Sequence, residues 1–252
     1  MNSPKVTVNL NNYQAVYDWY QSYRRPRPVT RLAYKALDVY YKPTLHYVDD
    51  AYDEFDDFRR DDTPQVFVLN HLTNHSDQFV ASAIAHQMTP EDVGHTRVLA
   101  KDELFHGTQR HFVDMMGAIP TFRKKDHTDT DIVERAGDAL IACTGNIVAA
   151  GQNMAVFGEG THNKVDPLVL QKLRPGFARI ALHAFAQGID VAITPIGMSF
   201  GTSLDSLQPR KAVAVITPSI RITAHDTIDT LVDATRELLQ SAVTQANAIR
   251  AK

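Results

Sequence analysis

The strongest constraint on the fold is a regular alternation of short apolar runs with longer amphipathic stretches. The short runs, such as QVFVLN at 65–70, are rich in β-branched and aromatic residues, which is typical of buried strands. The longer stretches repeat apolar residues every three or four positions, which is typical of helices that cover a sheet. The expected strands are 65–70, 96–100, 117–122, 154–158, 191–201 and one or two within 211–223, and the expected helices are 78–88, 110–116, 131–151, 175–188 and 226–249.

This alternation predicts a single α/β domain with a mixed, mostly parallel sheet flanked by helices. The length of 252 residues suits one such domain. In sheets of this kind, ligands bind at the carboxyl ends of the strands. We therefore expect the functional residues at the junctions where a strand ends and a helix follows.

The sequence favours a protein of the cytoplasm. No stretch approaches the roughly 18–20 consecutive apolar residues that cross a bilayer. The first residues, MNSPKVTVNLNN, lack the apolar core and cleavage site of a signal peptide. The single cysteine, Cys143, cannot form an intramolecular disulfide, which fits a reducing compartment. We expect neither export nor a membrane span.

Residues 1–48 differ in composition from residues 49–252 and are expected to form an N-terminal amphipathic segment of two helices. Residues 1–42 contain seven Lys and Arg but only two Asp. All nine tyrosines and the single tryptophan precede residue 53. The first helix, over 13–23, carries an aromatic stripe, and the second carries an apolar stripe of Val29, Leu32, Ala33, Ala36, Leu37 and Tyr40.

Two interpretations of this segment stay open. Tyr, Trp, Lys and Arg are favoured at an anionic membrane surface, so the segment is a candidate for membrane association. Alternatively, the aromatic residues form the core of an ordinary helical hairpin packed on the domain. The acidic stretch at 48–62 would repel phosphates and argues against nucleic-acid binding.

Candidate chemistry appears just after the first strand of the domain, where His71 is followed by His75 and Asp77. A histidine beside a carboxylate forms a general base with an orienting partner, because an imidazole with a pKa of about 6.5 accepts protons at neutral pH. The same three residues are also a candidate metal site, although no HExxH motif or cysteine pair accompanies them. Further along, GEGT at 158–161 is either a cradle of backbone N–H groups for an anion or a simple tight turn.

A serine hydrolase is another interpretation. GMSFG at 197–201 satisfies the G-x-S-x-G pattern with Ser199 as nucleophile, and Asp205 and His225 follow in the required order. That pattern needs a helix directly after the serine, whereas TSLDSLQPRK is typical of a turn. The context therefore disfavours this interpretation.

Taken in order, several blocks resemble the motifs of the glycerolipid acyltransferases, the family of the bacterial 1-acylglycerol-3-phosphate acyltransferases. The resemblance covers residues 66–198, about half of the chain. The blocks are NHLTNHSD (70–77), KDELF (101–105), MGAIPTFR (116–123), VFGEGTHN (156–163) with LRPGFARIA (173–181) behind it, and ITPIGMS (193–199).

The resemblance implies an enzyme that transfers an acyl group from a thioester to a hydroxyl without a metal or another cofactor. By this likeness, His71 is the general base and Asp77 orients it. The residues implied in binding the acceptor and its phosphate are Lys101, Arg123, Gly158, Glu159, Gly160, Thr161 and His162.

Two departures from the family pattern have physical consequences. One extra residue separates His71 from Asp77, so the loop must bulge to preserve their contact. In the third block, Gly158 replaces the usual proline and His162 the usual arginine. Imidazole is neutral at pH 7 unless a nearby charge raises its pKa, and it lacks the two-pronged geometry of guanidinium. Lys101, Arg123, Lys172 and Arg174 are the candidates to compensate.

The resulting hypothesis is a cytoplasmic acyltransferase on the inner face of the membrane that acylates a lysophospholipid such as 1-acylglycerol 3-phosphate in phospholipid synthesis. Acyl-coenzyme A or acyl carrier protein is the expected donor. The expected partners are this acceptor, the donor and an anionic membrane surface. The alternatives are a glycerol-3-phosphate or other lysolipid acyltransferase, and a non-catalytic lipid-binding protein of the same fold.

Overall fold

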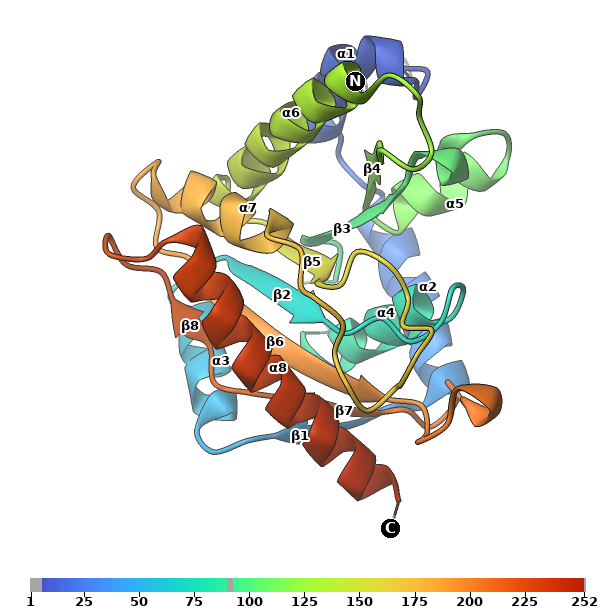
Figure 1. The fold of residues 1–252 in the computed structure, drawn as a ribbon, viewed down its shortest axis with the longest axis vertical. Coiled ribbons are helices and arrows are strands. Elements are labelled where there is room, and N and C mark those ends of the chain that lie inside the picture. The colour runs from blue at the N-terminus through green and yellow to red at the C-terminus, as the bar shows by residue number, and fades with distance from the viewer. Residues whose placement is uncertain (1–5, 90–92, 252) are drawn as a thin grey trace.

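The computed structural model describes residues 6–89 and 93–251, and it has the expected α/β architecture (Figure 1). Within these residues, one eight-stranded sheet has the order β1-β7-β6-β2-β5-β3-β4, with the short β8 paired to β6. From β6 to β4 all neighbours are parallel, whereas β7 and β8 run antiparallel to β6. The strands are β1 (Thr44–Tyr47), β2 (Gln65–Leu69), β3 (Thr96–Lys101), β4 (Ala118–Thr121), β5 (Asn153–Phe157), β6 (Ala192–Ser199), β7 (Val213–Ile216) and β8 (Ile220–Arg221).

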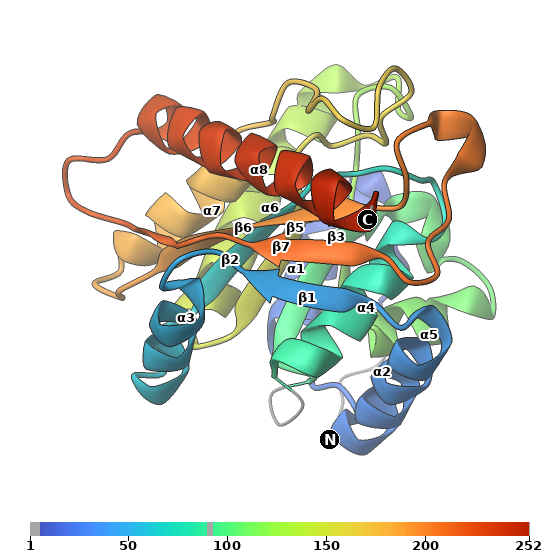
Figure 2. The ribbon, with the colours of Figure 1, turned by 90° about the horizontal axis from the view of Figure 1, so that it is seen from below.

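Helices cover both faces of the sheet (Figure 2). One face carries α6 (Thr130–Ala149), α7 (Gly176–Phe185) and α8 (Ile228–Arg250), and α1 (Tyr13–Ser22) packs against α6. The other face carries α2 (Arg27–Tyr41), α3 (Ala51–Arg60) and α4 (Asp77–Met88), and α2 packs against α4. The remaining elements are α5 (Gln109–Met115), η1 (Leu10–Asn12), η2 (Asp102–Phe105) and η3 (Leu204–Ser206).

The central strand β2 is buried on both faces, which explains its continuous apolar sequence. Val66 and Val68 belong to the core under α6 and α7, whereas Phe67 and Leu69 belong to the core under α3 and α4. Side chains of a strand alternate between its faces, so one strand contributes to both cores. This position holds the start of the following loop, with the first candidate residues, firmly in place.

Close packing of α8 on β6 depends on Gly197. A Cβ atom at this position would overlap the backbone of Ala242 and Val243 in α8. Glycine therefore lets the helix approach the strand directly. As a result, the carboxyl end of β6 is sealed from solvent on this face.

The predicted strands and helices are present with ends shifted by at most a few residues, but β1 and α3 were not predicted. β1 is a short, half-exposed edge strand inside the N-terminal segment, so that segment is not purely helical. The stretch that forms α3 is dominated by acidic residues. Its helical signal is the spacing of Ala51, Phe55 and Phe58, all of which are buried.

The two N-terminal helices differ in what they bury. Val16, Tyr17, Trp19 and Tyr20 of α1 lie in the main core. Tyr17, Trp19 and Tyr20 are therefore unavailable to a membrane, whereas Tyr13 is half-buried. The two helices pack on opposite faces of the sheet, α1 on α6 and α2 on α4, and not on each other as in the helical hairpin considered from the sequence.

The apolar stripe predicted for α2 is only partly correct. Ala33 and Leu37 pack inward with Tyr34, whereas Val29, Leu32 and Tyr40 are 52%, 70% and 55% exposed. The helix is turned because Tyr34 and Thr30 donate hydrogen bonds to the backbone around Met116. Its outward face therefore combines apolar residues with exposed basic ones such as Arg31 and Lys35.

Candidate active site

Four neighbouring parallel strands bring the predicted site residues to one edge of the sheet. β2, β5, β3 and β4 lie side by side in this order and run in the same direction. His71 follows β2, Glu159 follows β5, Lys101 ends β3 and Arg123 follows β4. The histidine and GEGT blocks are therefore direct neighbours, and Arg123 lies at the far end of the row.

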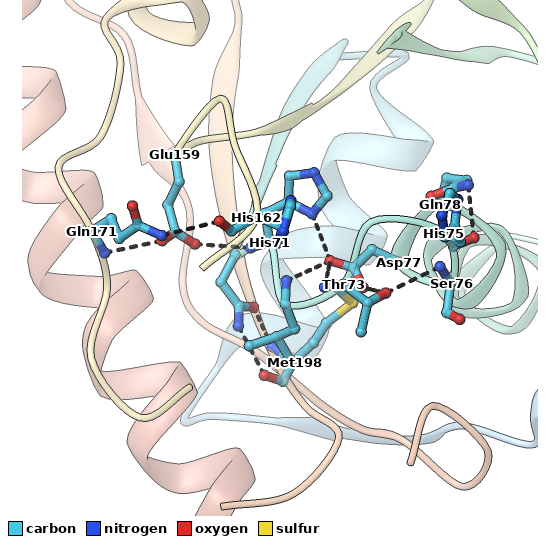
Figure 3. A network of polar contacts seen from close by, with 12 residues as sticks. His71, Thr73, His75, Ser76, Asp77, Gln78, Glu159, His162, Gln171 and Met198 are labelled. Atoms are coloured by element: carbon cyan, nitrogen blue, oxygen red, sulfur yellow. Dashed lines mark hydrogen bonds and ion pairs between the residues drawn. The ribbon is translucent and has the colours of Figure 1, made fainter. Parts of the chain in front are cut away.

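His71 and Asp77 are in direct contact, with Nδ1 of the imidazole 2.7 Å from Oδ2 of the carboxylate (Figure 3). Asp77 is the first residue of α4 and is fully buried. Because a carboxylate only accepts hydrogen bonds, Nδ1 carries the hydrogen. The lone pair of Nε2 is then left to accept a proton.

The extra residue between His71 and Asp77 is accommodated by a loop that wraps around the Asp77 carboxylate. Asp77 accepts the backbone N–H of Leu72 at 2.5 Å, that of Thr73 at 3.0 Å and the hydroxyl of Thr73 at 2.6 Å. The Thr73 oxygen in turn accepts the N–H of Ser76 at 3.0 Å. The bulge expected from the sequence therefore leaves the contact between His71 and Asp77 intact.

Aromatic rings determine the surroundings of the imidazole. Phe157 stacks on His71 with ring centroids 4.6 Å apart and planes at 25°. His162 approaches edge-on, with a centroid distance of 6.0 Å. The His71 side chain keeps 18% of its surface exposed. The imidazole is thus fixed in orientation yet remains accessible to a substrate.

Glu159 joins the two loops of the site. One carboxylate oxygen accepts the N–H of His71 at 2.8 Å, and the other accepts the N–H of Gln171 at 3.0 Å (Figure 3). The residue is almost fully buried, and this burial raises the pKa of its carboxyl group, opposed by the two backbone donors. The sequence suggested a role in the acceptor-binding turn. The contacts observed are those of a residue that positions His71, and the role in acceptor binding stays a prediction.

We expect Glu159→Gln to change how the stability depends on pH. A carboxyl group with a raised pKa holds its proton more tightly in the folded state. The contribution of Glu159 to the free energy of unfolding of the wild type therefore falls with rising pH. It falls between the pKa of the group in the unfolded state, about 4.3, and its higher pKa in the folded state. Glutamine does not titrate, so the free energy of unfolding of the variant should rise relative to wild type over this range. Urea melts of both proteins from about pH 4 to about pH 8 measure it, and a constant difference would contradict the prediction.

Each of the two positions in the GEGT turn requires glycine for a different structural reason. The N–H of Gly158 donates to the carbonyl of Leu69 at 2.9 Å, a bond that proline cannot make. A Cβ atom at Gly158 would also lie only 2.9 Å from Cγ1 of Val68. Gly160 has a φ of 68°, which favours glycine, and its N–H donates to the carbonyl of Phe157 at 3.0 Å. The departure from the family proline is therefore compatible with a well-formed turn.

The positive charge near His71 comes from lysines rather than from His162. Burial lowers the pKa of His162, and the charges of Lys164, His71 and Lys101 lower it further. His162 is therefore neutral at pH 7 and does not replace the charge of an arginine. Lys164 was missed from the sequence, where only its place two residues after His162 points to it. Thr161, half-buried, connects this histidine to the turn.

The other predicted cations have partners of their own. Nη2 of Arg123 lies 2.5 Å from Oδ2 of Asp126 in the turn that follows β4. Nζ of Lys101 lies 3.4 Å from a carboxylate oxygen of Glu103. The structure thus places both at the edge of the site but gives Arg123 a competing anion.

Of the two further cations that the sequence offers, Arg174 lies against the turn. The backbone N–H of Arg174 donates to the carbonyl of Gly158 at 2.8 Å. A Cβ atom at Gly160 would lie 3.1 Å from the Cγ atom of Arg174. Lys172 is exposed on the loop before α7. Arg174 is therefore the better placed of the two to compensate for the missing family arginine.

A second contact between a histidine and an aspartate was not foreseen. Nε2 of His127 lies 3.0 Å from Oδ2 of Asp102, and the imidazole packs edge-on against Phe122. Asp102 directly follows β3, whereas His127 belongs to the loop after β4. The pair therefore fastens the loop that carries Arg123 to the neighbouring strand.

The geometry rejects the hydrolase interpretation. Ser199 is buried and its hydroxyl donates to Oδ1 of Asn247 at 2.6 Å. His225 follows β8, which pairs with the first residues of β6, whereas Ser199 is the last residue of β6. The two residues are thus separated along the sheet by roughly 23 Å of strand. No serine triad forms from these residues.

The alternative metal site is not assembled either. His75 is exposed, and Figure 3 shows it apart from His71 and Asp77. Across residues 6–89 and 93–251, no group of three or more His, Cys, Asp or Glu side chains is arranged to hold a metal ion. The hydrogen bonds of Asp77 instead serve the loop and the imidazole.

The motifs, the fold and this dyad define the class of protein. The family model described as Acyltransferase matches residues 52–199, so the chain belongs to the acyltransferase family. The matched range contains His71, Asp77 and Glu159, and it confirms the family predicted from the motifs.

Among solved structures, the chain is similar to the 1-acyl-sn-glycerophosphate (LPA) acyltransferase PlsC from Thermotoga maritima. The two share 14% sequence identity with a TM-score of 0.57 over 98% of this chain and 97% of that chain. At this identity the likeness shows a common fold. No curated protein matches the sequence.

Proposed function

We propose that the protein is an O-acyltransferase that moves a fatty acyl group from an acyl thioester to a hydroxyl of a lysophospholipid of the 1-acylglycerol-3-phosphate type. The contact between His71 and Asp77 carries this proposal, because it leaves Nε2 as a base at the edge of the sheet. The family supports acyl transfer, and the likeness to an LPA acyltransferase supports the acceptor.

In the proposed mechanism, Nε2 of His71 takes the proton of the acceptor hydroxyl as its oxygen attacks the thioester carbonyl. The carbon–sulfur bond then breaks, and the leaving thiolate receives the proton from His71. The acyl group becomes an ester of the acceptor, so no acyl-enzyme is needed. Asp77 stabilises the imidazolium that forms between the two proton transfers.

The acceptor phosphate is proposed to bind beside the GEGT turn. Lys101 and Lys164 lie close enough to His162 to affect its pKa, and Arg174 lies against Gly160. These side chains supply the charge that neutral His162 lacks. Arg123 joins them only if the phosphate displaces Asp126, so we expect Arg123 to contribute less than its place in the family motif implies.

A small, mainly apolar cavity lies between α2, α4 and the sheet. Its volume is about 40 Å³, and its lining includes Tyr34, Leu69, Ala81, Ala85, Ala155 and Phe157. Gln78, Ser82, Thr96 and Arg97 also line it. Phe157 also stacks on His71, so the cavity begins beside the reacting groups. We assign the start of the acyl-chain groove to this cavity, with acyl-coenzyme A or acyl carrier protein as the donor.

Membrane association is proposed to use the outward face of α2 on the inner, cytoplasmic face of the membrane. Within the part of the chain that the structure describes, no helix is long and apolar enough to span a bilayer. The exposed Val29, Leu32 and Val39 of α2 lie among basic residues, which suits a helix lying on an anionic surface.

We expect the double substitution Leu32→Asp and Val39→Asp to reduce binding to anionic vesicles at least tenfold. Two acidic groups would replace exposed apolar side chains and repel the lipid headgroups. Deletion of residues 1–42 is not a suitable test, because it would remove the buried core residues of α1. Vesicle co-sedimentation measures the effect, and unchanged binding would exclude α2 from the membrane contact.

Thiol release from palmitoyl-coenzyme A tests the proposed reaction, with lysophosphatidate and glycerol 3-phosphate compared as acceptors. Turnover with lysophosphatidate alone supports the proposal, and turnover with glycerol 3-phosphate alone assigns the alternative acceptor. No turnover with either acceptor or with acyl carrier protein as donor, together with intact vesicle binding, would favour a non-catalytic lipid-binding protein.

A further inference from the structure

The loop between β5 and α7 exposes three apolar side chains near the active site. Val165 is 83% exposed, Leu168 is 37% exposed and Val169 is 53% exposed. Exposed apolar residues that cluster on one short loop are unusual, because each loses the stabilisation that burial would provide. The function proposed so far does not explain them.

The loop backbone is built to keep these side chains outward. The buried Asn163 donates to the carbonyls of Asp166 and Val169 at 2.7 and 2.8 Å, and its side-chain oxygen accepts the N–H of Val165 at 3.0 Å. The Asp166 carboxylate accepts the N–H of Leu168 at 2.8 Å. These bonds fold residues 163–169 into a compact turn.

Contacts with α8 hold this turn in place on the protein. Nε2 of Gln240 donates to the carbonyl of Leu168, and its side-chain oxygen accepts the N–H of Leu170, both at 2.9 Å. Nη1 of Arg236 donates to the carbonyl of Gln171, also at 2.9 Å. The exposure of the apolar side chains is therefore a fixed property of the fold.

The location of the turn relates it to the site and to α2. The loop starts at the carboxyl end of β5. The helix α2 ends just before β1, and Thr44, the first residue of β1, pairs with Val213. Val213 in turn pairs with Ser199 at the carboxyl end of β6, so the end of α2 and the start of the loop lie at the same end of the strands, at one edge of the sheet. Figure 2 shows the loop and α2 on opposite sides of the sheet near this edge. A flat surface placed against the edge would therefore meet both.

We propose that Val165, Leu168 and Val169 insert into the headgroup region of an anionic lipid bilayer and form a second membrane contact, independent of α2. The exposed Lys164 and Lys172 flank these residues, and their charge complements anionic lipids. This inference rests on the proposed function only in that the substrates are taken to reside in a lipid surface.

This contact would align the active site with the bilayer. The same loop carries His162 and Gln171, and Gln171 donates its N–H to the glutamate that positions His71. A bilayer bound at Val165 would thus lie beside the carboxyl edge of the sheet. The acceptor headgroup then reaches His71 while its acyl chain stays in lipid.

The first test compares vesicle binding of the intact protein and of the triple variant Val165→Ser, Leu168→Ser, Val169→Ser. The vesicles contain phosphatidylcholine and phosphatidylglycerol, and co-sedimentation gives the affinity. The matched control is Tyr52→Ser with Ile228→Ser, which removes exposed apolar side chains at the opposite edge. We expect at least tenfold weaker binding for the triple variant and wild-type binding for the control. Wild-type binding by the triple variant would overturn the proposal.

A second measurement reports insertion directly. Val165→Cys can be labelled selectively with an environment-sensitive dye, because the native Cys143 is buried. We expect a blue shift on addition of anionic vesicles and quenching by lipids that carry a spin label on the acyl chain. An unshifted spectrum would show that the loop does not insert and would reject the proposal. Loop substitutions that alter only the oligomeric state would reject it too and would point to a second copy of the chain as the occupant.

These binding readouts need no turnover, so they separate this inference from the proposed function. If the loop inserts but no thiol is released, the inference stands and the reaction fails. If thiol is released but the loop substitutions leave binding unchanged, the reaction stands and the inference fails. With a short-chain acceptor dissolved as monomers, the triple variant should keep wild-type turnover, because its substitutions leave the dyad unchanged.

Discussion

Replacing His71 with alanine is expected to slow acyl transfer by about 10²- to 10⁴-fold, the usual contribution of a positioned general base. The imidazole is the group whose nitrogen is free to accept the hydroxyl proton while the other nitrogen is held 2.7 Å from Asp77. Thiol release from palmitoyl-coenzyme A with saturating lysophosphatidate measures the effect. The loss should appear in kcat, because His71 acts in the transition state.

Two controls make this result specific. His75→Ala removes an exposed histidine four positions away and should keep wild-type turnover, which would also exclude a role for His75 as a metal ligand. Ser199→Ala should likewise leave turnover within about twofold. A His71→Ala protein with wild-type turnover would reject the proposed mechanism, and loss in Ser199→Ala alone would restore the hydrolase.

Replacing Asp77 with alanine is expected to lower the free energy of unfolding by about 3–5 kcal/mol in addition to abolishing most activity. The carboxylate accepts the N–H groups of Leu72 and Thr73, the hydroxyl of Thr73 and Nδ1 of His71. Each buried donor left without an acceptor costs about 1–3 kcal/mol. Urea denaturation followed by circular dichroism measures the change.

The contrast between the two variants tests the role of the loop. His71→Ala leaves the loop donors bound to Asp77, so it should destabilise far less than Asp77→Ala. Asp205→Ala, which removes an exposed carboxylate elsewhere, should stay within about 0.5 kcal/mol of wild type. Equal stability of Asp77→Ala and wild type would mean that the observed hydrogen bonds do not hold the loop.

The fold and the dyad were predictable from the sequence because both depend on local patterns. The apolar run of β2 and the periodicity of α4 place His71 and Asp77 at the two ends of one connection, whatever the rest of the chain does. The parallel arrangement then follows from the alternation of strands and helices. The bulge in the loop between His71 and Asp77 was also anticipated. The hydrogen bonds by which Thr73 stabilises this bulge were not.

Features that depend on distant segments were not predictable in the same way. The role of Glu159 requires the N–H of Gln171, and the contact of His127 with Asp102 joins two different strand ends. Arg123 pairs with the nearby Asp126, whereas the resemblance to the family predicted a phosphate as its partner. The outward face of α2 depends on its packing against α4 and Met116, which periodicity alone does not reveal.

The central place of β2 has a consequence for how the protein is made. Its two neighbours, β5 and β6, come from the second half of the chain, with Gln65 beside Ala192. A ribosome adding about 5–20 residues per second needs roughly ten seconds to deliver them. Until β5 emerges the apolar β2 has no partner on either side, and until β6 emerges it has a partner on one side only, so β2 stays incompletely paired through most of synthesis.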